Sequence, residues 1–432
     1  MNLLGRRKFL LGVALPGAAI VAGLSLPSYV KRIMAKNIEE MHDEYSMLQD
    51  IALRKLKLGA HPLIVKNADF RHSMDNISCE NTHFIDCYFY PGVIIRTTAL
   101  TNVRFEACQF MNCSFGNGVW ENVFFKRCDG RKMFRVIGGN GSKNVVFEEC
   151  HFMGGAPVSE ARHESFFGGV GSFGETRFND CDLKYVELLG ASKLEIEKSR
   201  LNKVEITNFQ AIGDTRISNS AVNESITVMG NFTSFVMKSV HFDYFSIEKF
   251  NSGVLEIEDC KGTFSGRLSK IKNVNIKNSE FQRQSIAGSE DLQFSGFQFQ
   301  FPDVETLLME NVKFSSGGNL QIGGGENYTY DENRPELGEK IVYAKIKKMS
   351  ILKTNIVNSA LSYINAQDME IHECELKDVD ITHNIFEKLR ISGGSMAGII
   401  TFANTSTKEF VEVKNKKDQG LNLRIPQILK SI

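Results

Sequence analysis

The side chains that could do chemistry in this 432-residue sequence are its nine histidines, nine cysteines and 51 acidic residues. Their spacing forms none of the motifs that bring such groups together, since there is no HExxH pair, no C-x-x-C pair and no G-x-S-x-G turn. The odd number of cysteines also excludes complete disulfide pairing within the chain. The sequence therefore predicts no catalytic residue, no cofactor-binding residue and no metal ligand set.

A five-residue repeat is the element that would position any functional side chain. Between Met349 and Ile391 apolar residues recur at every fifth place, and a second, mostly small or apolar series lies two places before each of them. Neither the 3.6-residue period of a helix nor the two-residue period of a strand fits this spacing. The pattern predicts an all-β solenoid that turns a corner every five residues and directs two of every five side chains into a narrow core. The centre positions that we expect in this core include Phe105, Phe110, Phe115, Ile351, Ile356, Leu361, Ile371, Leu376 and Ile381.

This repeat resembles that of the pentapeptide-repeat family, and Ala68-Asp69-Phe70 matches the lettering of that family. The resemblance implies a right-handed, four-sided parallel β-helix, which we expect over residues 61–391. The alternative is a pectate-lyase-like parallel β-helix with larger, unequal coils, because such coils also produce phrases such as Asn144 to Phe152.

The cysteines fit the repeat as core residues rather than as ligands. Cys87, Cys108, Cys128 and Cys150 are separated by 21, 20 and 22 residues, which is close to one coil each. We expect them to form a ladder of small, buried thiols on one side of the solenoid. Disulfides between adjacent rungs, in an oxidising compartment, are the alternative.

The first 60 residues read as two separate segments. In residues 1–32 a basic start precedes an apolar run, and Arg6, Arg7, Phe9 and Leu10 resemble the core of a twin-arginine signal. A general secretory signal or an uncleaved membrane anchor would also fit, and each places the rest of the chain in the bacterial periplasm or at the periplasmic face of the inner membrane. An anchor that is not cleaved would leave the N-terminus in the cytoplasm. Residues 33–60 predict an amphipathic helix that either caps the first coil or pairs with another protomer as a stalk.

Glycine clusters suggest where the solenoid is interrupted. We expect insertions at residues 126–146, 153–175 and 315–350, and a C-terminal cap over residues 392–432. None of these clusters has the Lys-Ser/Thr partner of a phosphate-binding loop.

Charge and fold lead to two functional hypotheses. The 51 basic and 51 acidic residues balance, so the chain lacks the basic field that nucleic-acid binding requires and the acidic field that DNA mimicry requires. The first hypothesis is a non-enzymatic, exported scaffold of the pentapeptide-repeat type, which binds an unknown protein partner and contacts the membrane through its N-terminal segment. The second is a lyase or hydrolase that acts on a polysaccharide with acidic and basic side chains on one outer face. The first is favoured, because the sequence alone does not single out catalytic side chains.

Overall fold

The computed structural model describes residues 63–155, 168–189, 192–267, 269–285, 293–294, 296–327, 340–413 and 422–424. Over these residues the chain is an all-β parallel solenoid of about 15 turns without helices, which confirms the predicted fold class. No helix within these ranges has the length and apolar character needed to cross a membrane. The predicted signal segment, with Arg6, Arg7, Phe9 and Leu10, and the predicted helix at 33–60 lie outside the described residues. The chain divides into two compact units, Met1–Arg200 and Leu201–Ile432.

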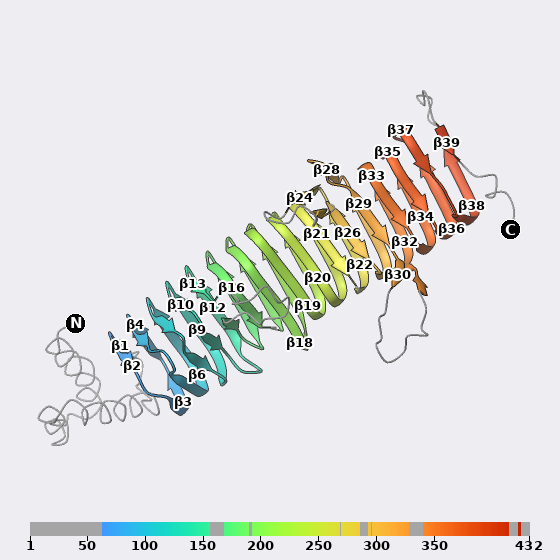
Figure 1. Ribbon diagram of the computed structural model, residues 1–432. Coiled ribbons are helices and arrows are strands. Elements are labelled where there is room, and N and C mark those ends of the chain that lie inside the picture. Colours follow the sequence, from blue (N-terminus) through green and yellow to red (C-terminus); the bar gives the residue numbers. More distant parts are fainter. Residues whose placement is uncertain are drawn as a thin grey trace, which may run out of the picture. The chain divides into compact units, whose positions relative to one another are not determined.

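The strand pairing in unit 1 forms four ladders, which we call sides A to D in chain order. Figure 1 shows the strands stacked one coil after another. Side A contains β1 (Leu63–Lys66), β4 (Thr82–Ile85), β12 (Lys143–Glu148), β15 (Glu175–Asn179), β17 (Lys193–Glu197) and the ends of β6 (Ile94–Glu106) and β9 (Val119–Lys126). Side B contains β2 (Asp69–Phe70), β5 (Tyr88–Phe89), β7 (Gln109–Met111), β10 (Asp129–Arg131), β13 (His151–Met153) and the start of β16 (Asp182–Leu189). Side C contains β8 (Ser114–Gly116), β11 (Arg135–Ile137), β14 (Gly169–Gly171), the end of β16 and the starts of β3 (Met74–Glu80) and β6. Side D is formed by the end of β3, the middle of β6 and the starts of β9 and β12.

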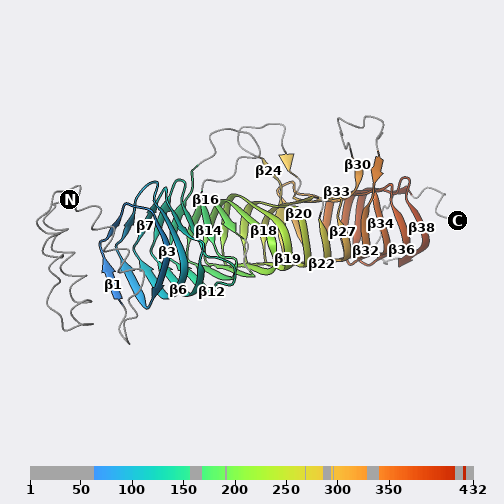
Figure 2. The same ribbon diagram turned by 90° about the horizontal axis from the view of Figure 1, so that it is seen from below.

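Unit 2 has the same kind of parallel stacking with longer strands, several of which run across two sides (Figure 2). One set of ladders contains the later parts of β18 (Arg200–Ser218), β19 (Ala221–Lys238) and β20 (His241–Glu258), followed by β22 (Lys270–Lys277), β27 (Asp303–Glu310), β32 (Ala344–Leu352), β34 (Ile364–His372), β36 (Ile385–Ser392) and β38 (Ser406–Val413). The other set contains β21 (Lys261–Arg267), β23 (Glu280–Gln282), β26 (Phe297–Gln300), β28 (Lys313–Ser315), β29 (Leu320–Gly323), β33 (Asn355–Ser362), β35 (Glu375–Thr382), β37 (Ser395–Thr401) and β39 (Asn422–Arg424). Two antiparallel hairpins leave this stack, β24 (Gln284–Ser285) with β25 (Gln293–Phe294) and β30 (Gly325–Asn327) with β31 (Lys340–Val342).

Stacked side chains of the same kind hold the coils of unit 1 together. On side A the rings of Phe84, Phe105, Phe125, Phe147 and Phe178 stack with centroids 4.6 to 4.8 Å apart, close to the spacing of neighbouring parallel strands. The structure buries all nine centre residues named above: Phe105, Phe110, Phe115, Ile351, Ile356, Leu361, Ile371, Leu376 and Ile381.

The corners depend on residues that tolerate a left-handed backbone. Between sides D and A the amides of Asn81, Asn102, Asn122 and Asn144 form a ladder in which each later Nδ2 donates to the Oδ1 of the coil before it. All four have a φ between 46° and 55°, which asparagine adopts more readily than most residues.

In the described residues, the places where the chain leaves the solenoid differ in part from those predicted. Residues 126–146 continue through β10, β11 and β12 in parallel pairing, so they form a coil and not an insertion. Residues 392–413 likewise continue as β37 and β38, because Gly393 and Gly394, both with positive φ, turn a corner instead of ending the fold. Among the described residues of 315–350, only the hairpin of β30 and β31 departs from the stack. The hairpin of β24 and β25 was not predicted. The middle of the insertion predicted at 153–175 lies outside the described residues.

Candidate active site

A column of cysteines lies at the corner between sides A and B of unit 1. The four predicted ladder residues Cys87, Cys108, Cys128 and Cys150 are buried and free, and Cys181 extends the column by one coil. Their sulfurs donate hydrogen bonds to backbone carbonyl groups, as from Cys150 Sγ to Phe125 O at 3.4 Å. Burial raises the pKa of Cys108 and Cys150 well above the ordinary value of a thiol. These thiols are therefore core groups rather than nucleophiles.

The residue after each of these cysteines faces outward on side B. Strand pairing places these residues on consecutive rungs, in the order Tyr88, Gln109, Asp129, His151 and Asp182. Neighbouring rungs of a parallel sheet are about 4.8 Å apart, so side chains from distant parts of the sequence form one straight row. We call this set the side B row.

An acid–base group lies at the end of the side B row. His151 Nδ1 is 3.4 Å from Asp182 Oδ2, and the two side chains are 40% and 35% exposed, so solvent reaches both. Arg200, the last residue of unit 1, has its Nη2 3.7 Å from the same Asp182 oxygen. One carboxylate therefore lies between an imidazole and a guanidinium group.

Asp129 provides a second carboxylate one rung from His151. Its Oδ2 accepts a hydrogen bond from Arg131 Nε at 2.9 Å and lies 2.8 Å from Arg131 Nη2. Its Oδ1 is buried and has no hydrogen-bond partner in the described part of the chain. A buried oxygen without a hydrogen bond raises the free energy of the folded protein, and a bound hydroxyl group or water that donates to it would remove this penalty.

A second outward row on side B adds cations and apolar surface beside these groups. Arg131, Met153 and Lys184 follow one another on consecutive rungs, and Lys184 Nζ lies 5.2 Å from the centre of the Tyr185 ring. Within the described ranges no group of three or more histidine, cysteine, aspartate or glutamate side chains is arranged to hold a metal ion. The arrangement offers an imidazole that can accept a proton, a carboxylate that orients it, and cations that can neutralise an anionic ligand.

The sequence prediction contained none of these functional residues. His151 was only one of nine scattered histidines, because Asp129, His151 and Asp182 are 22 and 31 residues apart and match no local motif. The signal that could have found them is the spacing of the cysteines, since Asp129 and His151 directly follow predicted ladder cysteines and Asp182 directly follows Cys181. A residue next to an inward-facing one on a strand faces outward.

Comparisons with known proteins find distant likenesses. No protein-family model matches the chain, and no curated protein matches it. Among solved structures, the chain resembles the A-module of the mannuronan C-5 epimerase AlgE6 of Azotobacter vinelandii, with 12% identity over 83% of this chain and 92% of that chain and a TM-score of 0.29. It also resembles a mannuronic acid specific polysaccharide family 6 lyase from human gut microbiota, with 12% identity over 85% of each chain and a TM-score of 0.27.

A pentapeptide-repeat structure is also among the matches. QnrB1, a plasmid-mediated fluoroquinolone resistance protein, has 11% identity over 56% of this chain and 92% of that chain, with a TM-score of 0.14. The other matches are mostly polysaccharide lyases and an epimerase. This finding contradicts the non-enzymatic scaffold that the sequence analysis favoured, so that prediction is wrong. TM-scores this low transfer no residue roles, and the likeness is confined to the β-solenoid fold.

Proposed function

We propose that this protein binds a linear, anionic polysaccharide along side B of unit 1 and removes a proton from one of its uronate rings. The observation that carries the proposal is the pair of His151 and Asp182, with Nδ1 and Oδ2 3.4 Å apart, in a straight outward row that also contains Asp129. A row with one side chain per rung suits a ligand that repeats along its own length, such as a polysaccharide lying parallel to the solenoid axis.

The chemistry follows from the acidity of uronates. In a uronate ring, the hydrogen on the carbon that bears the carboxylate becomes removable when a cation neutralises that carboxylate. Arg131, Lys184 and Arg200 supply cations on this face, and His151 is placed to accept the proton while Asp182 orients its ring.

Two outcomes share this first step. In elimination the electron pair of the broken C–H bond forms a carbon–carbon double bond, and the glycosidic oxygen leaves and takes up a proton. In epimerisation the same carbon is reprotonated on the opposite face of the ring. Neither route needs an added oxidant or reductant.

The test is turnover of defined uronate polysaccharides by the full chain. Alginate, pectate and hyaluronan would each be incubated with the protein, with ultraviolet absorbance reporting new double bonds and proton NMR reporting inverted centres. We expect His151→Gln to lower the rate by about 100-fold, the usual contribution of a positioned general base. The matched control is His241→Gln, which changes an exposed histidine of unit 2 and should leave the rate unchanged. Absence of turnover with all three polymers, or equal rates for His151→Gln and the wild type, would overturn the proposal.

A further inference from the structure

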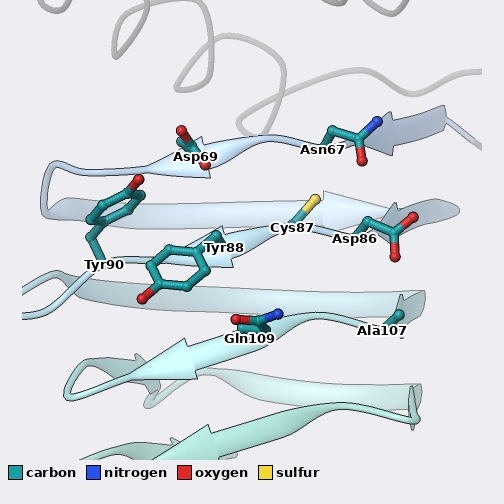
Figure 3. Close-up of a pocket in the computed structure, with 8 residues that line it drawn as sticks. All are labelled: Asn67, Asp69, Asp86, Cys87, Tyr88, Tyr90, Ala107 and Gln109. Carbon is teal, nitrogen blue, oxygen red and sulfur yellow. The ribbon is translucent and has the colours of Figure 1, made fainter. Parts of the chain in front are cut away.

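A small pocket opens on side B of unit 1, on the rungs that precede the acid–base group (Figure 3). Its volume is about 240 Å³, and its polar lining residues are Asn67, Asp69, Asp86, Tyr88, Tyr90 and Gln109. Drug-sized ligands occupy pockets of about 300–1,000 Å³, so this one has room for a single ring rather than for several.

A small corner residue lines one end of the pocket. Asn67, Asp86, Ala107 and Arg127 occupy equivalent corner positions on successive coils, each with a φ between 51° and 54°. At the third of these positions the methyl group of Ala107 lines the pocket, whereas the fourth carries the long side chain of Arg127. The backbone is the same at both corners, so side-chain size makes the difference.

One wall of the pocket is aromatic and fixed in place. The rings of Tyr88 and Tyr90 meet edge to face, with centroids 4.5 Å apart and an interplanar angle of 67°. Arg71 holds Tyr90 from outside the pocket, because its Nη2 donates to Tyr90 Oη at 2.7 Å and its guanidinium carbon lies 4.3 Å from the ring centre. Burial, with Tyr90 and Asp69 nearby, raises the pKa of Tyr88, so its hydroxyl group stays protonated and can donate a hydrogen bond.

The remaining lining groups are suited to hydroxyl groups and not to a carboxylate. Asp69 and Asp86 contribute acceptors, while the amides of Asn67 and Gln109 contribute both donors and acceptors. Arg71, the cation that contacts Tyr90, already pairs with Asp69 at 3.3 Å. Two carboxylates beside a paired arginine disfavour an anionic group and favour the neutral edge of a sugar.

We infer that this pocket is a distal sugar-binding subsite, which holds one ring of the polysaccharide by its hydroxyl groups against Tyr88. The inference rests on the proposed function. Tyr88 precedes His151 by three rungs of the side B row, which corresponds to about 14 Å. A disaccharide is too short to occupy both places, whereas a hexasaccharide is long enough.

The experiment compares the binding of short and long uronate oligosaccharides by calorimetry. The full-length His151→Gln variant would be titrated with disaccharides and hexasaccharides of alginate and pectate, because its expected turnover is about 100-fold slower than that of the wild type. We expect the hexasaccharide to bind more tightly, and Tyr88→Ala in this background to weaken hexasaccharide binding by about tenfold and to reduce the difference in affinity between the two lengths. Tyr88→Phe keeps the ring, so its affinity for the hexasaccharide should fall less than that of Tyr88→Ala. The control is Ser114→Ala on side C, which should change the affinity for neither the disaccharide nor the hexasaccharide.

Two results separate this inference from the proposed function. Equal affinity for the two lengths, or unchanged hexasaccharide binding in Tyr88→Ala, would overturn the subsite while turnover by the wild type still supports the proposed function. Length-dependent binding that requires Tyr88, without turnover by the wild type, would support the subsite and overturn the proposed proton removal.

Discussion

Cys150 and His151 are neighbours in the chain, yet their side chains lie on opposite sides of the solenoid wall. The thiol is 1% exposed and donates to a backbone carbonyl of the preceding coil, whereas the imidazole faces outward, 3.4 Å from Asp182. The same relation holds between Cys128 and Asp129 and between Cys181 and Asp182. The packing of the thiol column in the core therefore sets the alignment of the row outside it.

Thiol labelling tests the inward direction of this column. We expect a maleimide reagent to react slowly with the native protein and rapidly with all nine cysteines in denaturant, because every cysteine of the chain is free and buried. The count of modified thiols by mass spectrometry is the measurement. Rapid labelling of most cysteines under native conditions would mean that the column faces outward and that the side B row is wrongly aligned.

Alkaline pH should destabilise the fold through the same thiols. Burial raises the pKa of Cys79, Cys113 and Cys260 from 9.0 to about 12, and that of Cys374 to about 11. A folded-state pKa above the unfolded value gives a stabilisation that is complete below pH 9 and is lost as the pH rises toward these values, since the unfolded chain releases its protons first.

The measurement is the free energy of unfolding in urea between pH 7 and pH 11, for the wild type and for Cys374→Ala. Lysine and tyrosine also titrate in this range, so the difference between the two proteins isolates the thiol. We expect the variant to lose less stability above pH 9 than the wild type does. Parallel curves for the two proteins would contradict a raised pKa at Cys374.

The five-residue register could be read from the sequence because almost every coil repeats the same inward positions. It fails by one residue where a corner gains or loses a residue. Counting in fives from Phe84 predicts Ile94 as a core position. Ile94 is instead 37% exposed and Ile95 is buried, because Gly92, with a φ of 82°, adds a residue to the corner after Tyr90. Counting in fives from Ile217 likewise predicts Thr227, but Val228 is buried instead, since the strand pairing shifts near Glu224, which has a φ of 66°. A single sequence does not show which corner has the extra residue.

The candidate site was harder to predict than the core. Core positions repeat the same apolar residue types, whereas Asp129, His151 and Asp182 are charged or polar residues like many others on the surface. What distinguishes them is adjacency on neighbouring rungs, and this depends on coils of unequal length between Cys128 and Cys181.

Replacing Asp182 tests its role as the positioning residue for His151. We expect Asp182→Asn to lower kcat on the uronate substrate by about tenfold with little change in KM, because the imidazole loses its orientation but the substrate contacts remain. The free energy of unfolding should change by less than about 1 kcal/mol, since the ion pair with Arg200 is largely exposed. The control is Asp180→Asn, an exposed corner residue with a φ of 53° that asparagine tolerates. A raised KM with unchanged kcat would instead make Asp182 a binding residue.

The long coil that was predicted as an insertion depends on Gly130 and Phe134. On side B the rings of Phe70, Phe89 and Phe110 stack on consecutive rungs, and Gly130 on the next rung has no side chain. The ring of Phe134, from the following corner, stacks on Phe152 with centroids 5.4 Å apart. A Cβ atom at position 130 would lie 2.6 Å from Phe152 Cδ1 and 3.0 Å from Phe134 Cδ2. We expect Gly130→Ala to lower the free energy of unfolding by about 1–3 kcal/mol, because the new methyl group overpacks the core. Phe134→Ala should lower it by about 3–5 kcal/mol, because it leaves a cavity.

The double variant is the decisive measurement, because the two changes act on one space. Removing the Phe134 ring gives the new methyl group room. The double variant with Gly130→Ala and Phe134→Ala should therefore lose less free energy of unfolding than the sum of the losses in the two single variants. Gly169→Ala is the matched control, since its Cβ atom would come no closer than 3.3 Å to Ile137 Cδ1. Urea unfolding of the wild type and of the four variants provides the free energies. Strict additivity would show that Phe134 does not fill the place that Gly130 leaves, and the packing beneath Asp129 and His151 would then need another explanation.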